Sequence, residues 1–391
     1  MKNYQPIAYS VILVIGILIG NNLLIDYDSI YNKKLKKQST GYLDLVVPKF
    51  YEDKIKINSV IEIIKNNYVD DLSVLDSEEQ AINSIMSSLD PHSRYVSKKD
   101  FKYEQEGMKG SFSGVGIHFS ILNDSLVVIS PISGGPSYKL GIRSGDRIVY
   151  VDDENIASVG ITNQDVFERL RGEKGTNVNV KIYRKGIDSL LFFRIQRGDV
   201  PINSIETSYI IKENIGYIKI NQFSATTNNE FDAAANYLLQ KGMEKLILDL
   251  RGNGGGYLSS AIIMCNEFLY KNKLILFTRG DKRERTDYFS SYNGKLRDID
   301  LAILINQSSA SSSEIFAGCM QDHDRATIIG KRSFGKGLVQ EQIKLPDGSA
   351  IYLTTQRYYT PSGRCIQKPY AYNHKEYDSE SIFRINNEKT V

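Results

Sequence analysis

The chain has 391 residues, of which 41% are apolar and 24% charged, and its formal net charge is +3. This length predicts two or three domains, and the composition is that of a globular protein with a sizeable core. The charge is too small to indicate nucleic acid as a partner, and no Lys/Arg run carries interleaved aromatic residues.

The N-terminus is strongly apolar. Residues 3–25 contain no charged side chain, and 7–19 are almost wholly aliphatic, a length between a signal-peptide core and a full span of about 20 residues. Because no small-x-small cleavage site follows, we predict an uncleaved transmembrane anchor over 1–25, with Lys2 inside and the chain from Asp26 exported. A cleaved signal segment is the alternative. The predicted location is the cell envelope, anchored in the inner membrane with the bulk of the chain in the periplasm.

Residues 26–106 predict a mostly helical N-terminal region. Apolar residues recur at helical spacing over 50–64 and again over 82–89. In Leu89-Asp-Pro-His-Ser93 the proline restricts the residue before it, so the second helix should end there.

Residues 107–197 change to short β-like runs separated by glycine-rich turns. Such runs occur at 114–120, 126–129, 147–151 and 178–183, and one helix is expected at 163–171. About 90 residues of this texture fit one small β-rich module.

Residues 198–391 alternate between strands and helices, which predicts an α/β layer domain. Strands are expected at 215–220, 245–250, 301–305 and 326–329, with helices at 228–240, at 259–270 and after 305.

A serine cluster, Asn306-Gln-Ser-Ser-Ala-Ser-Ser-Ser-Glu314, follows one of these buried strands. The residue types suit simple capping of the next helix. The same place also suits a nucleophile, because unpaired N–H groups and the positive end of the helix would stabilise an oxyanion. No G-x-S-x-G elbow is present, and His323 lies too far along the helix to act as its base.

A lysine can act as the base in place of histidine when burial lowers its pKa. The candidate is Lys336 in Gly330-Lys-Arg-Ser-Phe-Gly-Lys-Gly337, where Phe334 and two glycines surround it. The stretch is not a phosphate loop, because Gly337 stands where a hydroxyl residue is needed for magnesium.

A glycine cluster, Asp249-Leu-Arg-Gly-Asn-Gly-Gly-Gly256, links a predicted buried strand to a helix. A tight turn is one explanation. Four glycines in five positions exceed what a turn needs, so they would also let a substrate approach main-chain N–H groups.

Together these stretches resemble the C-terminal processing (tail-specific) serine protease family. Its signature blocks are matched in order by 249–256, 309–314, 334–340 and Tyr359-Thr-Pro-Ser-Gly363, and its short motif before a PDZ domain by 89–93. The resemblance covers residues from about 50 to 368. It implies a crotonase-like (ClpP/crotonase) α/β catalytic domain at 198–391 with an inserted PDZ domain at 107–197.

The resemblance implies a role for each matching residue. Ser311 would be the nucleophile, Lys336 the general base and Gln340 the residue that orients the lysine. The backbone N–H groups of Gly256 and Ser312 would form the oxyanion hole, although Ser312 stands where the family commonly has alanine. No metal, nucleotide or other cofactor is implied.

The resemblance also implies a peptide-binding loop in the PDZ domain. Gly114, Val115, Gly116 and Ile117 would offer main-chain N–H groups to a terminal carboxylate while the peptide adds as a strand. Arg171 matches a family position near this loop, and we hypothesise that it couples tail binding to activation. A solvated arginine at a helix end is the alternative.

The sequence as a whole predicts a membrane-anchored, exported serine endopeptidase. It would recognise free or unstructured C-termini of peptide or protein substrates through its PDZ domain and cleave through a Ser–Lys acyl-enzyme. A peptide-binding scaffold with a dead catalytic domain and a small-molecule ester hydrolase are the alternatives. Whether the chain forms a homo-oligomer stays open.

Overall fold

The computed structural model describes residues 56–57, 59–61, 63–64, 66–70, 74–370, 377 and 380. The chain divides into two compact units, 1–74 and 75–391. In the first unit, residues described between 56 and 67 are helical, and the amide of Tyr68 donates to the carbonyl of Ile64 at 2.9 Å. The elements described below run from residue 74 onward.

Two helices and a short strand precede the β-rich module: α3 (Val74–Ser87), β1 (Arg94–Val96) and α4 (Lys98–Lys109). Helix α4 begins at a serine cap, where the Ser97 side chain accepts from the amide of Asp100 at 3.2 Å, and ends at Gly110 with φ +79°. Strand β1, which the sequence did not predict, pairs antiparallel with the late strand β18 (Ala350–Tyr359). The segment before the β-rich module therefore completes a sheet near the end of the chain.

The β-rich module has a six-stranded sheet in the order β3-β4-β5-β7-β8, with β6 paired to β5, and a separate β2–β9 pair. Strands β3, β4, β5 and β7 overlap the four expected β-like runs, β6, β8 and β9 were not among them, and α6 lies within the predicted helix. Fourteen buried, mostly β-branched residues fill its core. The elements are β2 (Ser111–Gly114), β3 (Ile117–Ile121), β4 (Leu126–Pro131), α5 (Pro136–Lys139), β5 (Arg147–Val151), β6 (Glu154–Asn155), α6 (Asn163–Leu170), β7 (Asn177–Tyr183), β8 (Leu191–Gln196) and β9 (Gly198–Pro201).

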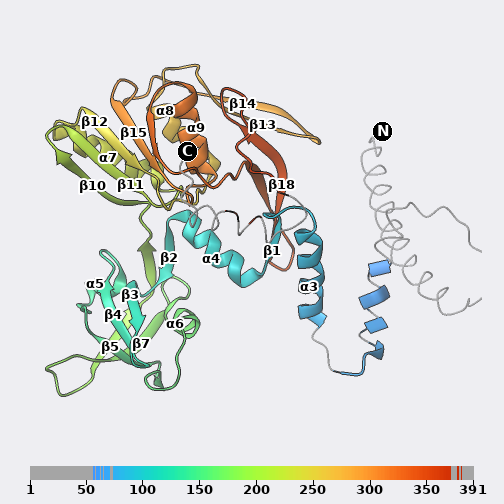
Figure 1. Ribbon diagram of the computed structural model, residues 1–391. Helices are drawn as coiled ribbons and strands as arrows, with labels where there is room; N and C mark the ends of the chain where they lie inside the picture. Colours follow the sequence, from blue (N-terminus) through green and yellow to red (C-terminus); the bar gives the residue numbers. More distant parts are fainter. Residues whose placement is uncertain are drawn as a thin grey trace, which may run out of the picture. The chain divides into compact units, whose positions relative to one another are not determined.

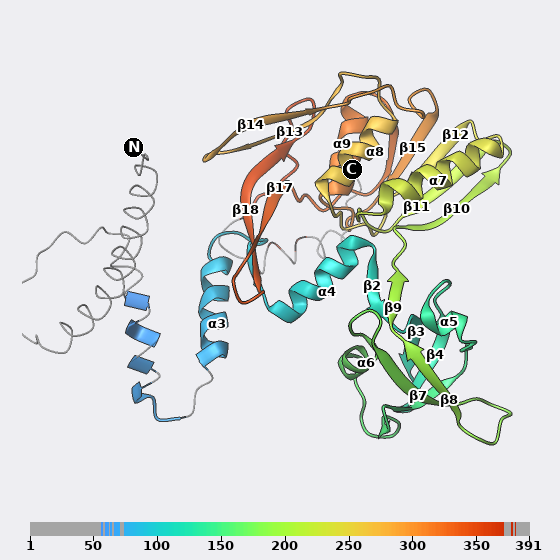
Figure 2. The same ribbon diagram turned by 180° about the vertical axis from the view of Figure 1, so that it is seen from behind.

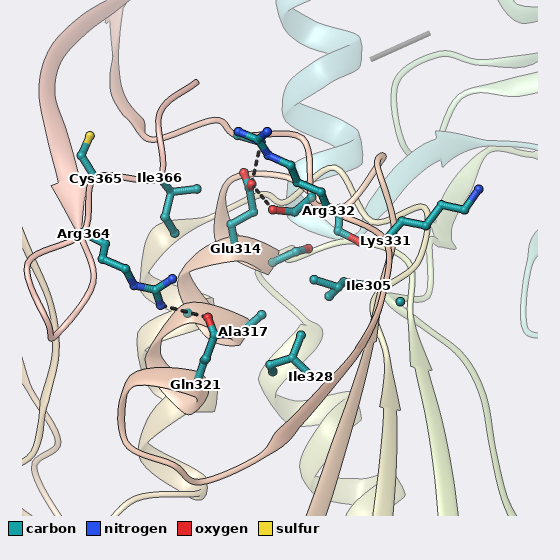
Figure 3. Close-up of a pocket in the computed structure, with 16 residues that line it drawn as sticks. Ile305, Glu314, Ala317, Gln321, Ile328, Lys331, Arg332, Arg364, Cys365 and Ile366 are labelled. Atoms are coloured by element: carbon teal, nitrogen blue, oxygen red, sulfur yellow. Dashed lines mark hydrogen bonds between the residues drawn. The ribbon is translucent and has the colours of Figure 1, made fainter. Parts of the chain in front are cut away.

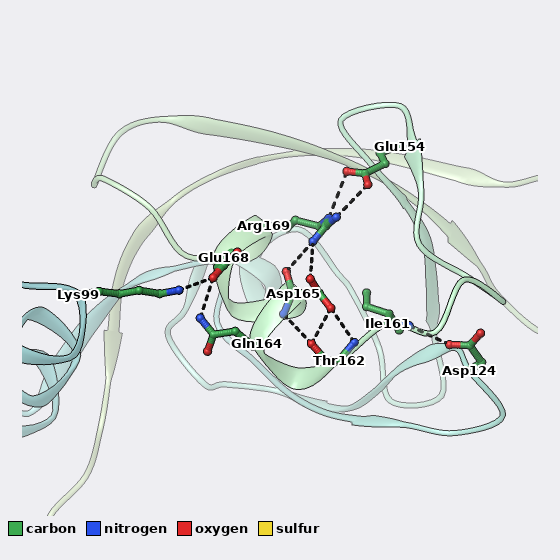
Figure 4. Close-up of polar contacts among 9 residues, drawn as sticks. All are labelled: Lys99, Asp124, Glu154, Ile161, Thr162, Gln164, Asp165, Glu168 and Arg169. Atoms are coloured by element: carbon green, nitrogen blue, oxygen red, sulfur yellow. Dashed lines mark hydrogen bonds and ion pairs between the residues drawn. The ribbon is translucent and has the colours of Figure 1, made fainter. Parts of the chain in front are cut away.

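Polar contacts hold helix α6 at both ends (Figure 4). At its start, Thr162 and Asp165 form a reciprocal capping box. Near its end, Arg169 binds Glu154 at 2.8 Å, and Glu168 forms an ion pair with Lys99 of α4. These pairs lie at the surface, where solvent and salt screen the charges, so they add little to stability. Their effect is to fix the orientation of the helix against the chain before it.

The C-terminal half contains two sheets (Figures 1 and 2). One has the order β10-β11-β12-β15-β16, parallel except at its first strand, and the other has β1-β18-β13-β14 with β17 paired to β18. The elements are β10 (Ile205–Lys212), β11 (Ile215–Ile220), α7 (Thr227–Gln240), β12 (Lys245–Asp249), α8 (Leu258–Glu267), β13 (Leu274–Gly280), β14 (Arg283–Phe289), β15 (Asp300–Ile305), α9 (Ser312–Asp322), β16 (Thr327–Gly330) and β17 (Leu338–Lys344). The mixed α/β class is as predicted.

Helices α8 and α9 lie between these two sheets (Figures 1 and 2). Every residue of α9 from Ser312 to Met320 is buried, because the helix packs on β13 on one side and β16 on the other. The rings of Phe231, Phe268 and Phe316 form a chain through this core, with centroids 5.8 and 5.5 Å apart. The start of α9, where the serine cluster lies, is thus held rigidly.

The prediction of a membrane anchor is corrected by the structure. The predicted segment, 1–25, lies outside the described residues, and among those residues no helix is long and apolar enough to cross a membrane. The longest described helices, α3 and α7, have 14 residues each, whereas a span needs about 20. On this finding the predicted location, an inner-membrane anchor with the bulk of the chain in the periplasm, is wrong.

Candidate active site

One cavity of about 740 Å³ gathers the five residues that the sequence predicted for catalysis. Most of its lining comes from four stretches far apart in the chain: the segment before the β-rich module, the glycine cluster, the start of α9 and the β17 strand with its preceding loop; Gln222, Tyr352 and Tyr358 add to it. The predicted residues that line it are Ser311, Ser312, Lys336, Gln340 and Gly256. Residues 114–117 and Arg171 do not line this cavity and lie in the β-rich module.

Ser311 has a backbone conformation that is rare for a residue other than glycine. Its φ is +54° and its ψ −114°, directly before the first turn of α9. The hydroxyls of its neighbours have structural roles: those of Ser309 and Ser313 donate to the carbonyls of Leu250 and Asn253 at 2.8 and 3.0 Å. The hydroxyl of Ser312, which also lines the cavity, donates to the carbonyl of Gly256 at 2.9 Å, so the hydroxyls of these three neighbours are all engaged by backbone carbonyls.

Lys336 is largely buried in the same cavity, and this burial lowers the pKa of its amine below the usual lysine value. The charge of Arg94 lowers it further, and the carboxylates of Asp90 and Glu314 oppose the shift. Its Nζ donates to Oε1 of Gln340 at 2.8 Å. Across the described part of the chain, no hydrogen bond joins Lys336 Nζ to the Ser311 hydroxyl.

Glu314, which the sequence analysis treated only as part of a capping pattern, joins the serine to the lysine loop. Its carboxylate is 3% exposed and accepts four hydrogen bonds. One oxygen accepts from the amides of Ser311 and Lys336 at 2.9 and 2.8 Å, and the other from Gly335 and the Ser333 hydroxyl at 2.6 and 2.7 Å. Burial raises the pKa of this carboxyl, and the four donors act against that rise.

The glycine cluster lies against the start of α9 because its residues have no side chains. A Cβ on Gly255, whose φ is +100°, would lie 2.7 Å from the carbonyl oxygen of Ala310 and 2.8 Å from Cβ of Ser311. The Gly255 amide is already bound to Asn253 Oδ1 at 2.8 Å. In the described residues no hydrogen bond engages the amides of Gly256 or Ser312, so both are available to a ligand in the cavity.

His92 lines this cavity, although the sequence analysis did not propose it as a site residue. Burial, together with the nearby Lys336 charge, lowers the pKa of its imidazole to about 4, so the ring is neutral near pH 7. Its Nε2 lies 2.7 Å from the hydroxyl of Tyr377. His323, in contrast, contacts the carbonyl of Leu274 at 2.7 Å and lies outside the cavity, which agrees with its exclusion as a base.

A second cavity of about 640 Å³ lies on the other side of α9 (Figure 3). Glu314, Ala317 and Gln321 of the helix line it, and Gln321 accepts from Arg364 at 2.9 Å. Neither Ser311 nor Lys336 borders it. Glu314 thus lies between the two cavities.

The predicted peptide-binding loop, 114–117, borders an apolar groove between β3 and α6. Val115, Gly116, Ile117 and Arg171 line this groove, whereas Gly114 forms a backbone bridge to Arg171 beside it. The other lining residues are mainly apolar: Phe112, Phe119, Val166, Phe167 and Leu170. The groove is therefore mainly apolar, and Arg171 is the one charged residue among the described residues that line it.

The Arg171 guanidinium lies over three aromatic rings rather than in solvent. Its carbon is 5.1, 4.6 and 4.7 Å from the ring centres of Tyr103, Phe112 and Phe167. Glu106 of α4 lies 3.5 Å from its Nη1, and the arginine side chain is only 26% exposed. The alternative of a solvated arginine does not fit this environment. Arg171 instead connects the groove to helix α4.

The chain is similar to known proteins over most of its length. Residues 214–374 match the description "Peptidase family S41", and residues 113–191 match a PDZ domain. It is 38% identical to the carboxy-terminal-processing protease of Bartonella bacilliformis over 325 residues, which cover 81% of this chain and 73% of that protein.

Two further proteins are similar to this chain. The carboxy-terminal processing protease CtpB of Bacillus subtilis is 33% identical over 319 residues, which cover 80% of this chain and 65% of that one, slightly less than two thirds of its length. A solved photosystem II D1 C-terminal processing protease is 27% identical, with a TM-score of 0.46, over 82% of this chain and 91% of that one.

Replacing Glu314 by glutamine should destabilise the protein, because the side-chain NH2 group would face amides that need an acceptor. Even if the glutamine turns its NH2 group toward the Ser333 hydroxyl, which can accept, the amide of Gly335 loses its acceptor, so the free energy of unfolding should fall by about 1–3 kcal/mol. Urea denaturation measures this value. The exposed Glu284→Gln variant is the control and should change it by less than about 0.5 kcal/mol. Equal stability of Glu314→Gln and wild type would contradict the anchoring role.

Proposed function

The chain belongs to peptidase family S41, and we propose that it is a serine endopeptidase that holds the C-terminus of a substrate polypeptide in its PDZ groove and cleaves the chain upstream. The observation that carries this proposal is the meeting of Ser311, Lys336 and two unengaged amides, those of Gly256 and Ser312, in one cavity. Nucleophile, base and oxyanion donors are the groups that acyl transfer requires.

In the first half of the proposed reaction, the neutral amine of Lys336 removes the proton from the Ser311 hydroxyl, and the oxygen attacks the scissile carbonyl carbon. The resulting oxyanion accepts hydrogen bonds from the amides of Gly256 and Ser312. When the C–N bond breaks, the lysine ammonium gives its proton to the leaving amine. An ester on Ser311 remains.

In the second half, Lys336 removes a proton from water, and the hydroxide attacks the ester carbon through the same oxyanion site. The C–O bond to the serine breaks, Ser311 recovers its proton from the lysine, and a new carboxylate leaves. Gln340 accepts a hydrogen bond from Lys336 Nζ at 2.8 Å, which supports its proposed role in orienting the amine. The serine and the lysine have no direct hydrogen bond at rest, so substrate binding has to bring them into contact.

For the PDZ domain, we propose that residues 114–117 donate main-chain hydrogen bonds to a terminal carboxylate while the peptide adds as a strand beside β3. The apolar groove next to this loop would take the last side chain of the peptide. Arg171 would couple peptide binding in the groove to the position of α4, because its guanidinium contacts Tyr103 and Glu106 of that helix. Gly107 and Met108, at the end of α4, line the catalytic cavity.

For the architecture, we propose that 198–391 is a crotonase-like α/β catalytic domain and that the PDZ domain at 107–197 is inserted after a helical region at 26–106. The parallel sheet β11-β12-β15-β16 with α8 and α9 packed on it supports the first part. The return of β1 to pair with β18 supports the insertion, since the chain contributes to the catalytic half before and after the PDZ domain.

The proposed function predicts which variants of the full chain cut an unstructured reporter polypeptide. Wild type should cut it, and amidation of the reporter's C-terminus should slow the reaction. Ser311→Ala and Lys336→Ala should each lower the rate by a factor of about 10³ or more. Mass spectrometry of the products measures this. Ser308→Ala and Lys331→Ala, in the same two loops, are the matched controls and should cut as wild type does.

Two results would contradict the proposal. Cleavage by Ser311→Ala at the wild-type rate would place the nucleophile elsewhere. A wild-type chain that binds the free reporter tail without cutting it would be a peptide-binding scaffold.

The pH dependence of cleavage should reveal the lowered pKa of Lys336. Only the neutral amine can take the serine proton, so kcat/KM should rise with pH and level off above the lysine pKa. Because that pKa is lowered, the midpoint should lie below the value of about 10.4 for free lysine. Arg94→Gln removes a repulsive charge and should move the midpoint to higher pH. A midpoint at or above the free value would contradict the assignment.

The Arg171→Ala variant tests the coupling proposal. We expect wild type to cut the reporter with a free C-terminus faster than the amidated one, and the ratio of these two rates should fall toward one in the variant. Arg194→Ala, an exposed arginine on β8, is the control and should keep the wild-type ratio. An unchanged ratio in Arg171→Ala, with tail binding intact by calorimetry, would show that this residue does not couple the two sites.

A further inference from the structure

The turn between α3 and β1 reaches the catalytic cavity, although it lies some 220 to 250 residues before the residues it meets there. Pro91 and His92 of this turn line the cavity together with Ser311 and Lys336. The main-chain carbonyl of His92 accepts a hydrogen bond from Nε2 of Gln340. A backbone group before the PDZ domain therefore contacts the residue that binds the lysine.

Asp90 holds this turn in shape. Its side chain is 7% exposed, and Oδ1 accepts from the amides of His92 and Ser93 at 2.9 and 3.0 Å. Oδ2 accepts from the Ser93 hydroxyl at 2.5 Å. A buried carboxylate with this many donors at its own turn fixes the direction of the following carbonyls.

The same carboxylate also binds the strand next to Gln340. The hydroxyl of Thr354 donates to Asp90 Oδ1 at 3.1 Å, and the amide of Thr354 donates to the Ser93 hydroxyl at 3.0 Å. Thr354 of β18 is the cross-strand partner of Gln340 of β17. The position of the Gln340 amide depends on its cross-strand neighbour, Thr354, and on its acceptor, the His92 carbonyl. Asp90 binds both Thr354 and the turn that carries this carbonyl.

The orientation of the Gln340 amide matters because its two ends differ in chemistry. The His92 carbonyl can only accept, so it must face the NH2 end. The oxygen end then points to Lys336 Nζ, where it accepts at 2.8 Å. If the carbonyl moved away, the amide could rotate by 180° and present NH2 to the lysine, which would turn an acceptor into a competing donor.

We propose that Asp90 is a positioning residue for the reaction: through the 90–93 turn it fixes the Gln340 amide so that the oxygen orients the Lys336 amine toward Ser311. The proposal rests on the function proposed above, in which Lys336 is the base. It assigns a catalytic purpose to a segment that precedes the PDZ domain. Asp90 itself touches neither substrate nor reacting atoms.

A double-mutant cycle in the full chain tests the route through Gln340. Asp90→Ala should lower kcat for the reporter by about 10- to 100-fold with KM changed less than about twofold, as a misplaced base would. Gln340→Ala should lower kcat similarly. In the Gln340→Ala background, Asp90→Ala should cost less than about threefold more, because the group it positions is already absent. The same large factor in both backgrounds would overturn the proposal.

Two variants separate positioning from loss of fold or charge. Asp90→Asn keeps the Oδ1 acceptor for His92, Ser93 and Thr354, so it should recover most of the wild-type kcat. A loss as large as that of Asp90→Ala would overturn the proposal in favour of a role for the negative charge. Asp322→Ala removes another buried carboxylate, whose partners are Ser362 and Arg364, and serves as the control for general destabilisation.

Hydrogen exchange of the Gln340 side-chain amide tests the proposal without any catalysis, so it applies even if the reporter is not cut. The side-chain NH2 protons of Gln340, identified in amide NMR spectra by their absence in Gln340→Ala, should exchange with solvent slowly in wild type. In Asp90→Ala they should exchange about tenfold faster or more, and in Asp322→Ala at the wild-type rate. Unchanged exchange in Asp90→Ala would overturn the proposal. Lack of reporter cleavage by wild type, in contrast, would count against the proposed function alone.

Discussion

The arrangement of the active site depends on one buried carboxylate, that of Glu314. One of its oxygens accepts from the amide of Ser311 at the start of α9 and from the amide of Lys336 in the loop before β17. Two distant segments of the backbone therefore share one acceptor. The hydroxyl of Tyr358 adds a second link, since it contacts the carbonyls of both Ser311 and Lys336. A carboxylate near the first turn of a helix is also stabilised by the helix dipole. Geometry and electrostatics therefore favour the same placement.

This constraint explains why Ser311, the proposed nucleophile, lies on a strained backbone in a rigid surrounding. A φ of +54° at Ser311 is unfavourable by itself and persists only where neighbouring contacts determine the conformation. Those contacts come from the glycine cluster, which approaches closely because Gly255 has no side chain, and from the buried helix α9. The lysine loop is held from the other side by the 90–93 turn through Gln340. The site is therefore formed by residues that precede the PDZ domain in sequence together with residues that follow it.

In sequence, the PDZ domain lies between the 90–93 turn and the other residues of the site. Its groove connects to the catalytic half through Arg171, whose guanidinium packs on rings from both the PDZ domain and α4. Helix α4 then leads to the cavity at Gly107 and Met108. A peptide in the groove and a peptide bond in the cavity are thus separated by one helix and a few aromatic contacts, which gives the proposed coupling a short physical route.

Much of the site follows from the sequence. The family resemblance placed Ser311, Lys336, Gln340, Gly256 and Ser312 together, and the structure puts all five in one cavity. The resemblance to the C-terminal processing protease family is confirmed, and the α/β class and the main strands are as predicted, because local periodicity and turn residues determine them. The predicted location is corrected, because no helix among the described residues is long and apolar enough to cross a membrane, and the predicted anchor segment, 1–25, lies outside those residues.

Tertiary structure decided the rest. The residue types of 306–314 indicated a capping pattern, but only the fold showed that the carboxylate of Glu314 binds the loop around Lys336. Strand β1, and the contact of the His92 carbonyl with Gln340, join residues some 250 positions apart. Periodicity and capping are properties of neighbours along the chain. Contacts of this length depend on how two sheets and a buried helix pack, and no local pattern records that packing.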